Sequence, residues 1–255
     1  MLRKERQGKI LAILKQEKRV IIKELAQRLG VSVITIRRDF DELSGSGRIK
    51  KVYGGAVLPD IAPVQQGQPL FSARIHRQRA EKIHIAQAAA ALVQENDVIV
   101  LDIGTTCLEV ARQVKDFSNI TVLTNSVPIL VELMDSELEI YSLGGRLRSK
   151  QQALYGSIAL KSMEDFCVNK AFISAANITL ENGLTGVHRD SAELCSAIIQ
   201  RAEQAILVAD SSKFEKNSLA VIGPLECVDT IITDSGISKR YADEIRARGI
   251  RLIIV

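Results

Sequence analysis

The sequence predicts an α/β protein of two unequal domains, in which a small helical domain with a β-hairpin precedes a larger α/β domain built on a mostly parallel sheet. Three observations lead to this fold class. Residues 1–58 contain three short amphipathic segments followed by a glycine-centred hairpin. Residues 59–72 are rich in proline and glutamine and carry no periodic pattern, as a linker does. Residues 73–255 alternate short apolar runs with helical segments, the order that builds parallel sheets.

The N-terminal domain is predicted to begin with two helices. Residues 3–17 place an apolar stripe among basic residues, made of Ile10, Leu11, Ile13 and Leu14. A short β-branched run follows at 18–22. Residues 23–29 then predict a second helix, which packs through Leu25, Ala26 and Leu29. Gly30 is expected to end this helix, because glycine readily takes the left-handed conformation found after helix C-termini.

A third helix is predicted to begin after Ser32, whose hydroxyl can accept a hydrogen bond from an unpaired backbone N–H of the first turn. Apolar residues then recur at spacings of three and four, which places them on one packing face: Val33, Ile36, Phe40 and Leu43. Gly45 and Gly47 are expected to end the helix. The opposite face carries two adjacent guanidiniums and other exposed groups, namely Ile34, Thr35, Arg37, Arg38 and Asp41.

A basic hairpin follows the third helix. Alternation over Ile49, Val52 and Val57 with a turn at Gly54–Gly55 predicts two strands. This order of elements is that of a winged helix-turn-helix, whose last helix enters the major groove of DNA. An arginine pair alone is more often a solvated helix surface. The combination, however, favours contact with double-stranded operator DNA by a set of eight residues, Ser32, Ile34, Thr35, Arg37, Arg38, Lys50, Lys51 and Tyr53.

The charge distribution supports this hypothesis. Residues 1–60 hold 14 Lys and Arg against 7 Asp and Glu, whereas residues 61–255 hold 20 against 23, within an overall net charge of +4. Basic N-termini also occur as solvated surface. A positive domain joined to a nearly neutral one is nevertheless typical of a module that binds a polyanion.

The larger domain is predicted to alternate strands and helices. The expected strands are 98–102, 120–124, 139–143, 171–174, 205–209, 230–233 and 250–255. The expected helices are 80–94, one that begins at the threonines after the first strand and ends near 115, 128–134, 156–163, 190–202 and 238–248. Ligands of parallel α/β sheets bind beyond the carboxyl ends of the strands, and several of these strands end in polar or glycine residues.

The composition argues against several classes of protein. No apolar run approaches eighteen residues and the N-terminus is charged, so no membrane span or signal sequence is expected. The four cysteines are scattered without a C-x-x-C pair, which argues against zinc and disulfides and for reduced, mostly buried thiols: Cys107, Cys167, Cys195 and Cys227. We therefore expect a cytoplasmic protein without a metal ion or cofactor.

A candidate phosphate site follows the first strand of the larger domain. Residues 102–106 (DIGTT) offer a close backbone turn, two hydroxyls and the N–H groups of a helix N-terminus. An ordinary strand-to-helix turn capped by threonine explains these residues equally well. Lys213, at the end of another strand, could neutralise the same dianion, and Lys82 could supply a second positive charge. Either lysine alone would more often be a surface residue.

Motifs in both domains give the sequence a resemblance to a known family. V-S-x-x-T-I-R-R-D-F-x-x-L, followed by V-Y-G-G-A, resembles the DNA-binding signature of the DeoR family of bacterial sugar-metabolism repressors. The sequence departs from that signature at Phe40, where the family has leucine, a substitution that a core tolerates. The larger domain resembles the sensor domain of the same family through D-x-G-T-T, T-N-S at 124–126, L-G-G at 143–145, G-x-x-A at 156–159, A-D-S-S-K at 209–213 and I-T-D at 232–234.

This resemblance implies a fold similar to ribose-phosphate isomerases and glucosamine-phosphate deaminases, with a phosphorylated sugar as the effector. It implies phosphate contacts at Lys82, Gly104, Thr105, Thr106 and Lys213. It also implies contacts with sugar hydroxyls at Asp102, Asn125, Ser126, Gly144 and Gly145.

The favoured hypothesis is a transcriptional repressor of a carbohydrate-utilisation operon that is not an enzyme and whose operator affinity changes when the effector binds. The alternative is a sugar-phosphate isomerase or deaminase with a DNA-binding appendage. After the strand at 171–174 the chain continues AANITLENG, where related isomerases carry acidic residues, and alanine and asparagine cannot act as general bases. Glu181, Asp190 and Glu193 remain possible substitutes, although helix capping and dipole compensation explain the last two. A homodimer or homotetramer is expected, because one winged helix offers little interface.

Overall fold

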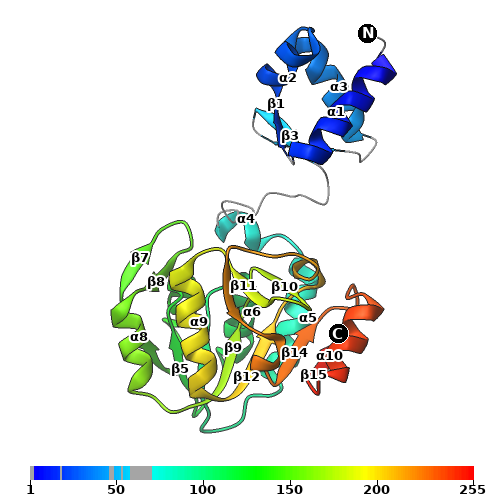
Figure 1. Ribbon diagram of the computed structural model, residues 1–255. Helices are drawn as coiled ribbons and strands as arrows, with labels where there is room; N and C mark the ends of the chain where they lie inside the picture. Colours follow the sequence, from blue (N-terminus) through cyan, green and yellow to red (C-terminus); the bar gives the residue numbers. More distant parts are fainter. Residues whose placement is uncertain (1–2, 18, 46–48, 53, 58–70) are drawn as a thin grey trace. The chain divides into compact units, whose positions relative to one another are not determined.

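The computed structural model describes residues 3–17, 19–45, 49–52, 54–57 and 71–255 (Figure 1). The chain divides into two compact units, residues 1–66 and residues 67–255. The first forms one hydrophobic core and the second forms two, one on each face of its main sheet. The predicted fold class is confirmed, since the first unit is helical with a small sheet and the second is an α/β unit with a parallel sheet.

The N-terminal unit follows the predicted order of elements, which are α1 (Arg3–Glu17), β1 (Arg19–Ile21), α2 (Ile22–Leu29), α3 (Val33–Gly45), β2 (Lys50–Val52) and β3 (Gly55–Val57). The strands form an antiparallel sheet in the order β1-β3-β2. The predicted hairpin is therefore confirmed, and the run at 18–22 contributes a third strand that we did not predict. Gly55 allows this pairing, because a Cβ at that position would overlap the backbone carbonyl of Val20.

The three helices pack around one small core. The fully buried side chains that the helices contribute come from the predicted apolar faces: Ile10, Leu14, Leu25, Ile36, Phe40 and Leu43. Leu11, Ile13, Leu29 and Val33 lie at the edge of this core and are partly exposed. Phe40, the departure from the family signature, is 1% exposed, so the larger ring is accommodated in the core.

The second unit is built on a seven-stranded sheet in which all neighbouring strands are parallel, in the order β15-β14-β12-β9-β4-β5-β6. The strands are β4 (Val98–Leu101), β5 (Thr121–Thr124), β6 (Glu139–Ser142), β9 (Val168–Ile173), β12 (Ala202–Val208), β14 (Thr230–Thr233) and β15 (Arg251–Ile254). Alternate residues of each strand face opposite sides. In β4, Ile99 and Leu101 belong to one core and Val100 to the other.

Helices cover both faces of this sheet (Figure 1). One face packs against α4 (Phe71–Ile75), α5 (Arg79–Ala90), α6 (Thr105–Val114) and α7 (Val127–Leu133). The other packs against α8 (Ser157–Glu164), α9 (Arg189–Arg201) and α10 (Lys239–Ala247). Among the described residues, none of the helices combines the length and the apolar character that crossing a bilayer requires.

Two small antiparallel sheets on this unit were not predicted. One is the hairpin of β7 (Arg146–Arg148) and β8 (Ala153–Tyr155). The other consists of β10 (Asn177–Thr179), β11 (Gly183–Gly186) and β13 (Ala220–Gly223). Strands of three or four residues are too short to show a period of two, and the equally short strands of the parallel sheet were predicted from their alternation with helices, which these strands do not share.

Candidate functional site

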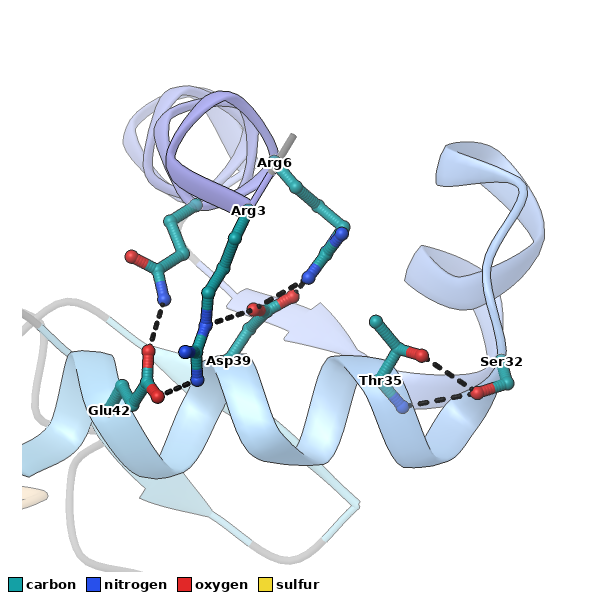
Figure 2. Close-up of polar contacts among 7 residues, drawn as sticks. Arg3, Arg6, Ser32, Thr35, Asp39 and Glu42 are labelled. Carbon is teal, nitrogen blue, oxygen red and sulfur yellow. Dashed lines mark hydrogen bonds and ion pairs between the residues drawn. The ribbon is translucent and has the colours of Figure 1, made fainter. Parts of the chain in front are cut away.

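The start of α3 is fixed by a side-chain cap. The Ser32 hydroxyl accepts a hydrogen bond from the backbone N–H of Thr35 at 3.2 Å and lies 2.9 Å from the Thr35 hydroxyl (Figure 2). Gly30 ends α2 with a left-handed φ of 64°, as predicted. The sequence thus determines a tight turn between α2 and α3, which is the geometry of a helix-turn-helix.

The exposed face of α3 carries the groups expected to meet DNA. Arg37 and Arg38 are exposed, and neither guanidinium forms an ion pair with a carboxylate among the described residues. Ile34 is 64% exposed on the same face, which is unusual for a large apolar side chain. Two positive charges and an apolar side chain are therefore free to contact a ligand.

The structure describes only part of the three hairpin residues that we expect to contact DNA. Lys50 and Lys51 lie in β2, where their backbones pair with β3, but their side chains lie outside the described part of the structure. Tyr53 lies outside the described residues altogether.

The second unit contains a cavity of about 50 Å³ at the carboxyl ends of three adjacent strands. Asp102 follows β4, Ser174 follows β9 and Ala209 follows β12, and all three residues line the cavity. This is the position at which open parallel sheets bind ligands. The structure brings five of the ten predicted effector residues to this cavity: Asp102, Gly104, Thr105, Thr106 and Lys213.

The predicted turn at Gly104 presents the N-terminus of α6 to the cavity. Gly104 has a φ of 144°, and a Cβ there would lie 2.6 Å from the Ser174 hydroxyl oxygen, so the close approach requires glycine. Thr105 and Thr106 begin the helix and are buried. The free N–H groups of this first turn and the two hydroxyls are donors suited to an anion.

Two half-buried cationic side chains line the same cavity. Burial lowers the pKa of Lys213, and the nearby Asp210 carboxylate opposes that effect. Arg74 of α4, which sequence reasoning missed, also lines the cavity; burial lowers its pKa, and its Nε is buried without a hydrogen-bond partner among the described residues. Both side chains are half-buried, so an incoming anion would interact with them more strongly than with cations in bulk water.

Lys82 does not line the cavity, although it was expected to contact phosphate. Its ammonium donates to the backbone carbonyl oxygens of Arg74 at 2.6 Å and Arg77 at 2.5 Å. Burial lowers its pKa to about 8, an effect opposed by Asp210. The lysine therefore holds the end of α4 in place, and with it the segment that carries Arg74.

The other predicted effector residues lie at the ends of β5 and β6, outside the cavity lining. The Asn125 amide donates to the Leu154 carbonyl, while its own oxygen and the Ser126 hydroxyl are buried without hydrogen-bond partners among the described residues. Gly144 and Gly145 both have positive φ, of 70° and 105°. The structure thus divides the predicted set into a cavity group and an adjacent group.

Sequence reasoning also missed Gln151, Tyr155, Ser174 and Cys195, which line the cavity. The Tyr155 side chain is 1% exposed and its hydroxyl has no hydrogen-bond partner in the described structure. Gln151 and Tyr155 come from the β7–β8 hairpin, which no sequence signal predicted. Of the four cysteines, all of them free, Cys107 and Cys195 are buried, Cys227 is half-buried and Cys167 is exposed.

The acidic residues considered for the enzyme hypothesis lie elsewhere. Asp190 accepts hydrogen bonds from Arg146 at 2.8 Å and Arg148 at 2.7 Å, and the N-cap of α9 is His188 rather than Asp190. Asp190 therefore ties the β7–β8 hairpin to α9. It does not cap this helix as we expected, but it does lie in the first turn, where dipole compensation places a carboxylate. Glu181 and Glu193 are absent from the cavity lining, whereas Asp102 is part of it.

Asp102 gives the cavity a testable pH dependence. Burial raises its pKa to about 7, and hydrogen bonds from the backbone and hydroxyl of Ser174 oppose that rise. Between about pH 4 and pH 7 the folded protein keeps a proton that the unfolded chain has released. The contribution of this group to the unfolding free energy is therefore full below about pH 4 and is lost as the pH rises to about 7. We expect Asp102→Asn to gain about 4 kcal/mol in unfolding free energy relative to the wild type between pH 4 and pH 8.

Denaturant unfolding of both proteins across this range measures the difference. Parallel stability profiles for the wild type and Asp102→Asn would show that the Asp102 carboxyl titrates normally.

Two family models match the chain. The DeoR-like helix-turn-helix domain matches residues 6–62, and the DeoR C-terminal sensor domain matches residues 77–235. The curated relatives include the transcriptional repressor AccR of Agrobacterium fabrum, which is 38% identical over 91% of this chain and 90% of that protein. They also include the transcriptional repressor GlcR of Bacillus subtilis, 33% identical over 100% of this chain and 97% of that protein.

A third relative is the lactose phosphotransferase system repressor of Lactococcus lactis, 32% identical over 96% of each chain. Among solved structures, the chain is similar to ribose 5-phosphate isomerase A from Methanocaldococcus jannaschii, at 17% identity and a TM-score of 0.41 over 54% of this chain and 55% of that one. A DeoR helix-turn-helix domain followed by a DeoR sensor domain, in a chain aligned over nearly its full length with transcriptional repressors, places the protein in the DeoR family of transcriptional regulators.

Proposed function

We propose that this protein is a repressor whose affinity for operator DNA changes when a phosphorylated sugar binds the cavity of its sensor domain. The main support for the proposal is the pair of half-buried cations, Lys213 and Arg74, that line the cavity beside the N-terminus of α6. Burying positive charge without an anion costs free energy, so such a site is suited to a dianionic ligand.

On the DNA side, we assign recognition to α3. Its exposed face would enter the major groove, where Arg37 and Arg38 can donate to guanine and Ile34 can contact a thymine methyl group. Ser32 and Thr35 at the start of the helix would lie near the DNA backbone. We assign Lys50, Lys51 and Tyr53 of the basic hairpin that follows α3 to contacts with DNA phosphates, which add affinity without base specificity.

On the effector side, we assign the phosphate to Gly104, Thr105, Thr106, Lys213 and Arg74. Lys82 supports this site by holding the backbone of Arg74. The sugar hydroxyls would meet buried polar atoms of Asn125, Ser126 and Tyr155 that have no hydrogen-bond partner among the described residues, together with Asp102 and the backbone at Gly144 and Gly145. The lactose phosphotransferase system repressor among the relatives supports a link to carbohydrate use. Because its partner would be chromosomal DNA, we place the protein in the cytoplasm.

A thermal-shift screen against a panel of sugar phosphates tests this assignment. A ligand that binds only the native state raises the unfolding free energy by RT ln(1 + [L]/Kd), which is about 2.7 kcal/mol when its concentration is a hundred times Kd. We expect at least one sugar phosphate to raise the unfolding temperature, and the same sugar without phosphate to have a much smaller effect. Steady turnover of the stabilising compound would instead support the isomerase or deaminase alternative.

We further propose that the protein acts as a homodimer or homotetramer that reads paired half-sites. A single winged helix buries too little surface for tight specific binding, and two-fold symmetry would match a palindromic operator. Light scattering at micromolar protein is expected to give at least twice the mass of 28.0 kDa for one chain. A monomer both with and without DNA would contradict this assembly.

A further inference from the structure

A polar clamp joins the first turns of α1 to the middle of α3 in the DNA-binding unit (Figure 2). Its centre is Asp39 on α3, whose side chain is fully buried. The Asp39 carboxylate accepts a hydrogen bond from Arg6 Nε at 2.5 Å and another from Arg6 Nη2 at 3.0 Å. The Arg6 side chain is 11% exposed, so this bidentate pair is largely shielded from water.

A second tie lies one helical turn further along α3. Glu42 accepts a hydrogen bond from the Gln7 amide at 2.9 Å and forms an ion pair with Arg3. Residues 3, 6 and 7 share one face of α1, and residues 39 and 42 share one face of α3. The two ties therefore act along the same line between the two helices, which we call the α1–α3 clamp.

The clamp adjoins the groups assigned to DNA recognition. Asp39 follows Arg37 and Arg38 directly, and successive residues of a helix are turned by about 100°. The rotation of α3 that seats Asp39 against α1 is thus the rotation that directs both arginines outward. The apolar contacts of α3 do not fix this rotation so closely, because hydrophobic packing is non-directional whereas a bidentate guanidinium–carboxylate pair has a defined geometry.

Stability alone does not account for a charged pair at this position. Transferring two ions out of water carries a desolvation cost, and apolar residues of similar volume are often as stabilising as a buried ion pair. We infer that Arg6 and Asp39 are positioning residues that fix the orientation of α3, so that Arg37 and Arg38 discriminate operator from other DNA. This inference rests on the proposed role of α3 as the recognition helix.

The ratio of operator affinity to non-operator affinity tests this inference. The probes are an operator duplex selected by the wild-type protein from a random pool and a scrambled duplex of the same length and composition. Partial unfolding lowers both affinities by the same factor and leaves their ratio unchanged, whereas misdirected arginines lower the ratio. The main variant is Arg6→Met/Asp39→Leu, which replaces the buried pair with apolar residues and leaves no unpaired charge.

We expect this double variant to fold and to lose about tenfold or more in the ratio, which is the discrimination that one bidentate base contact supplies. Its affinity for the scrambled duplex should stay near that of the wild type. The matched control is Arg28→Gln/Glu17→Gln, which removes an exposed ion pair of the same domain that does not involve α3. That control should leave the ratio unchanged. A folded Arg6→Met/Asp39→Leu protein with the wild-type ratio would overturn the inference.

Arg6→Lys provides a second test that does not depend on the double variant folding. It keeps a positive charge beside Asp39 but cannot form the bidentate pair. We expect a smaller fall in the ratio, of about threefold, and an unchanged ratio would again overturn the inference. Arg37→Ala and Arg38→Ala, measured in parallel, distinguish failure of the recognition-helix assignment from failure of the positioning role. If neither lowers the ratio, the recognition-helix assignment itself fails; if they do and the clamp variants do not, the positioning role of the clamp alone fails.

Discussion

The Lys213→Met variant is expected to bind operator DNA like the wild type and to lose about 10- to 150-fold in affinity for the effector phosphate. Hydrogen bonds to charged groups contribute about 1.5 to 3 kcal/mol each, and methionine keeps the apolar stem of lysine while removing the ammonium. The ligand-free variant should be no less stable than the wild type, because burial lowers the pKa of Lys213 and so already disfavours its charged form. Calorimetric titration with the sugar phosphate found by thermal shift measures the loss.

Lys216→Met is the matched control for this prediction. Lys216 follows Lys213 by three residues, donates to the Ser212 carbonyl at 3.0 Å and is exposed, outside the cavity lining. Its replacement removes the same charge from the same loop and should leave effector affinity nearly unchanged. Equal losses in the two variants would indicate a general effect of positive charge near the cavity rather than a contact by Lys213.

The Arg37→Ala variant is expected to lose operator affinity by about 1 to 3 kcal/mol, with relaxed specificity at one base pair. The Arg37 guanidinium is exposed on α3, so its removal should leave the fold intact. Its effect should fall on the selected operator and much less on a scrambled duplex, because a base contact carries sequence information whereas a phosphate contact does not. Fluorescence anisotropy with both duplexes over a range of salt concentrations measures the two components.

Arg28→Ala serves as the control for the loss of one positive charge. Arg28 lies on α2, is exposed and pairs with Glu17. Equal weakening on both duplexes, with a salt dependence reduced by about one counterion, would assign Arg37 to a phosphate instead. Normal operator binding by folded Arg37→Ala and Arg38→Ala proteins would refute the recognition-helix assignment.

Sequence reasoning predicted the DNA-binding unit well because its signals are local. The Ser32 cap, the glycine stop at Gly30 and the spacing of Ile36, Phe40 and Leu43 each act within one or two helical turns. The pairing of β1 with β3 and the burial of Asp39 against Arg6 were missed. Both join segments far apart in the sequence, and a carboxylate beside two arginines resembles an ordinary solvated surface group.

In the sensor domain, the sequence motifs predicted only some of the residues that line the cavity. The D-x-G-T-T motif and Lys213 came together as predicted, because strand ends in a parallel sheet meet at one edge. Lys82 did not, since a motif places a charged residue near a site without fixing where its long side chain ends. Arg74 and Tyr155 carried no sequence signal. They reach the cavity through a five-residue helix and a short hairpin, whose positions depend on packing against the rest of the unit.

We expect a sugar phosphate bound to the sensor domain to change the affinity of the helix-turn-helix domain for DNA, and the proposed function depends on this coupling. Titrating the complex of wild-type protein and selected operator with the stabilising sugar phosphate, and separately with the same sugar lacking phosphate, tests it most directly. A coupling of about 1 to 3 kcal/mol predicts a 5- to 150-fold change in operator affinity with the phosphorylated sugar, which is lost in Lys213→Met. An operator affinity that stays constant while the sugar phosphate saturates the protein would contradict the claim.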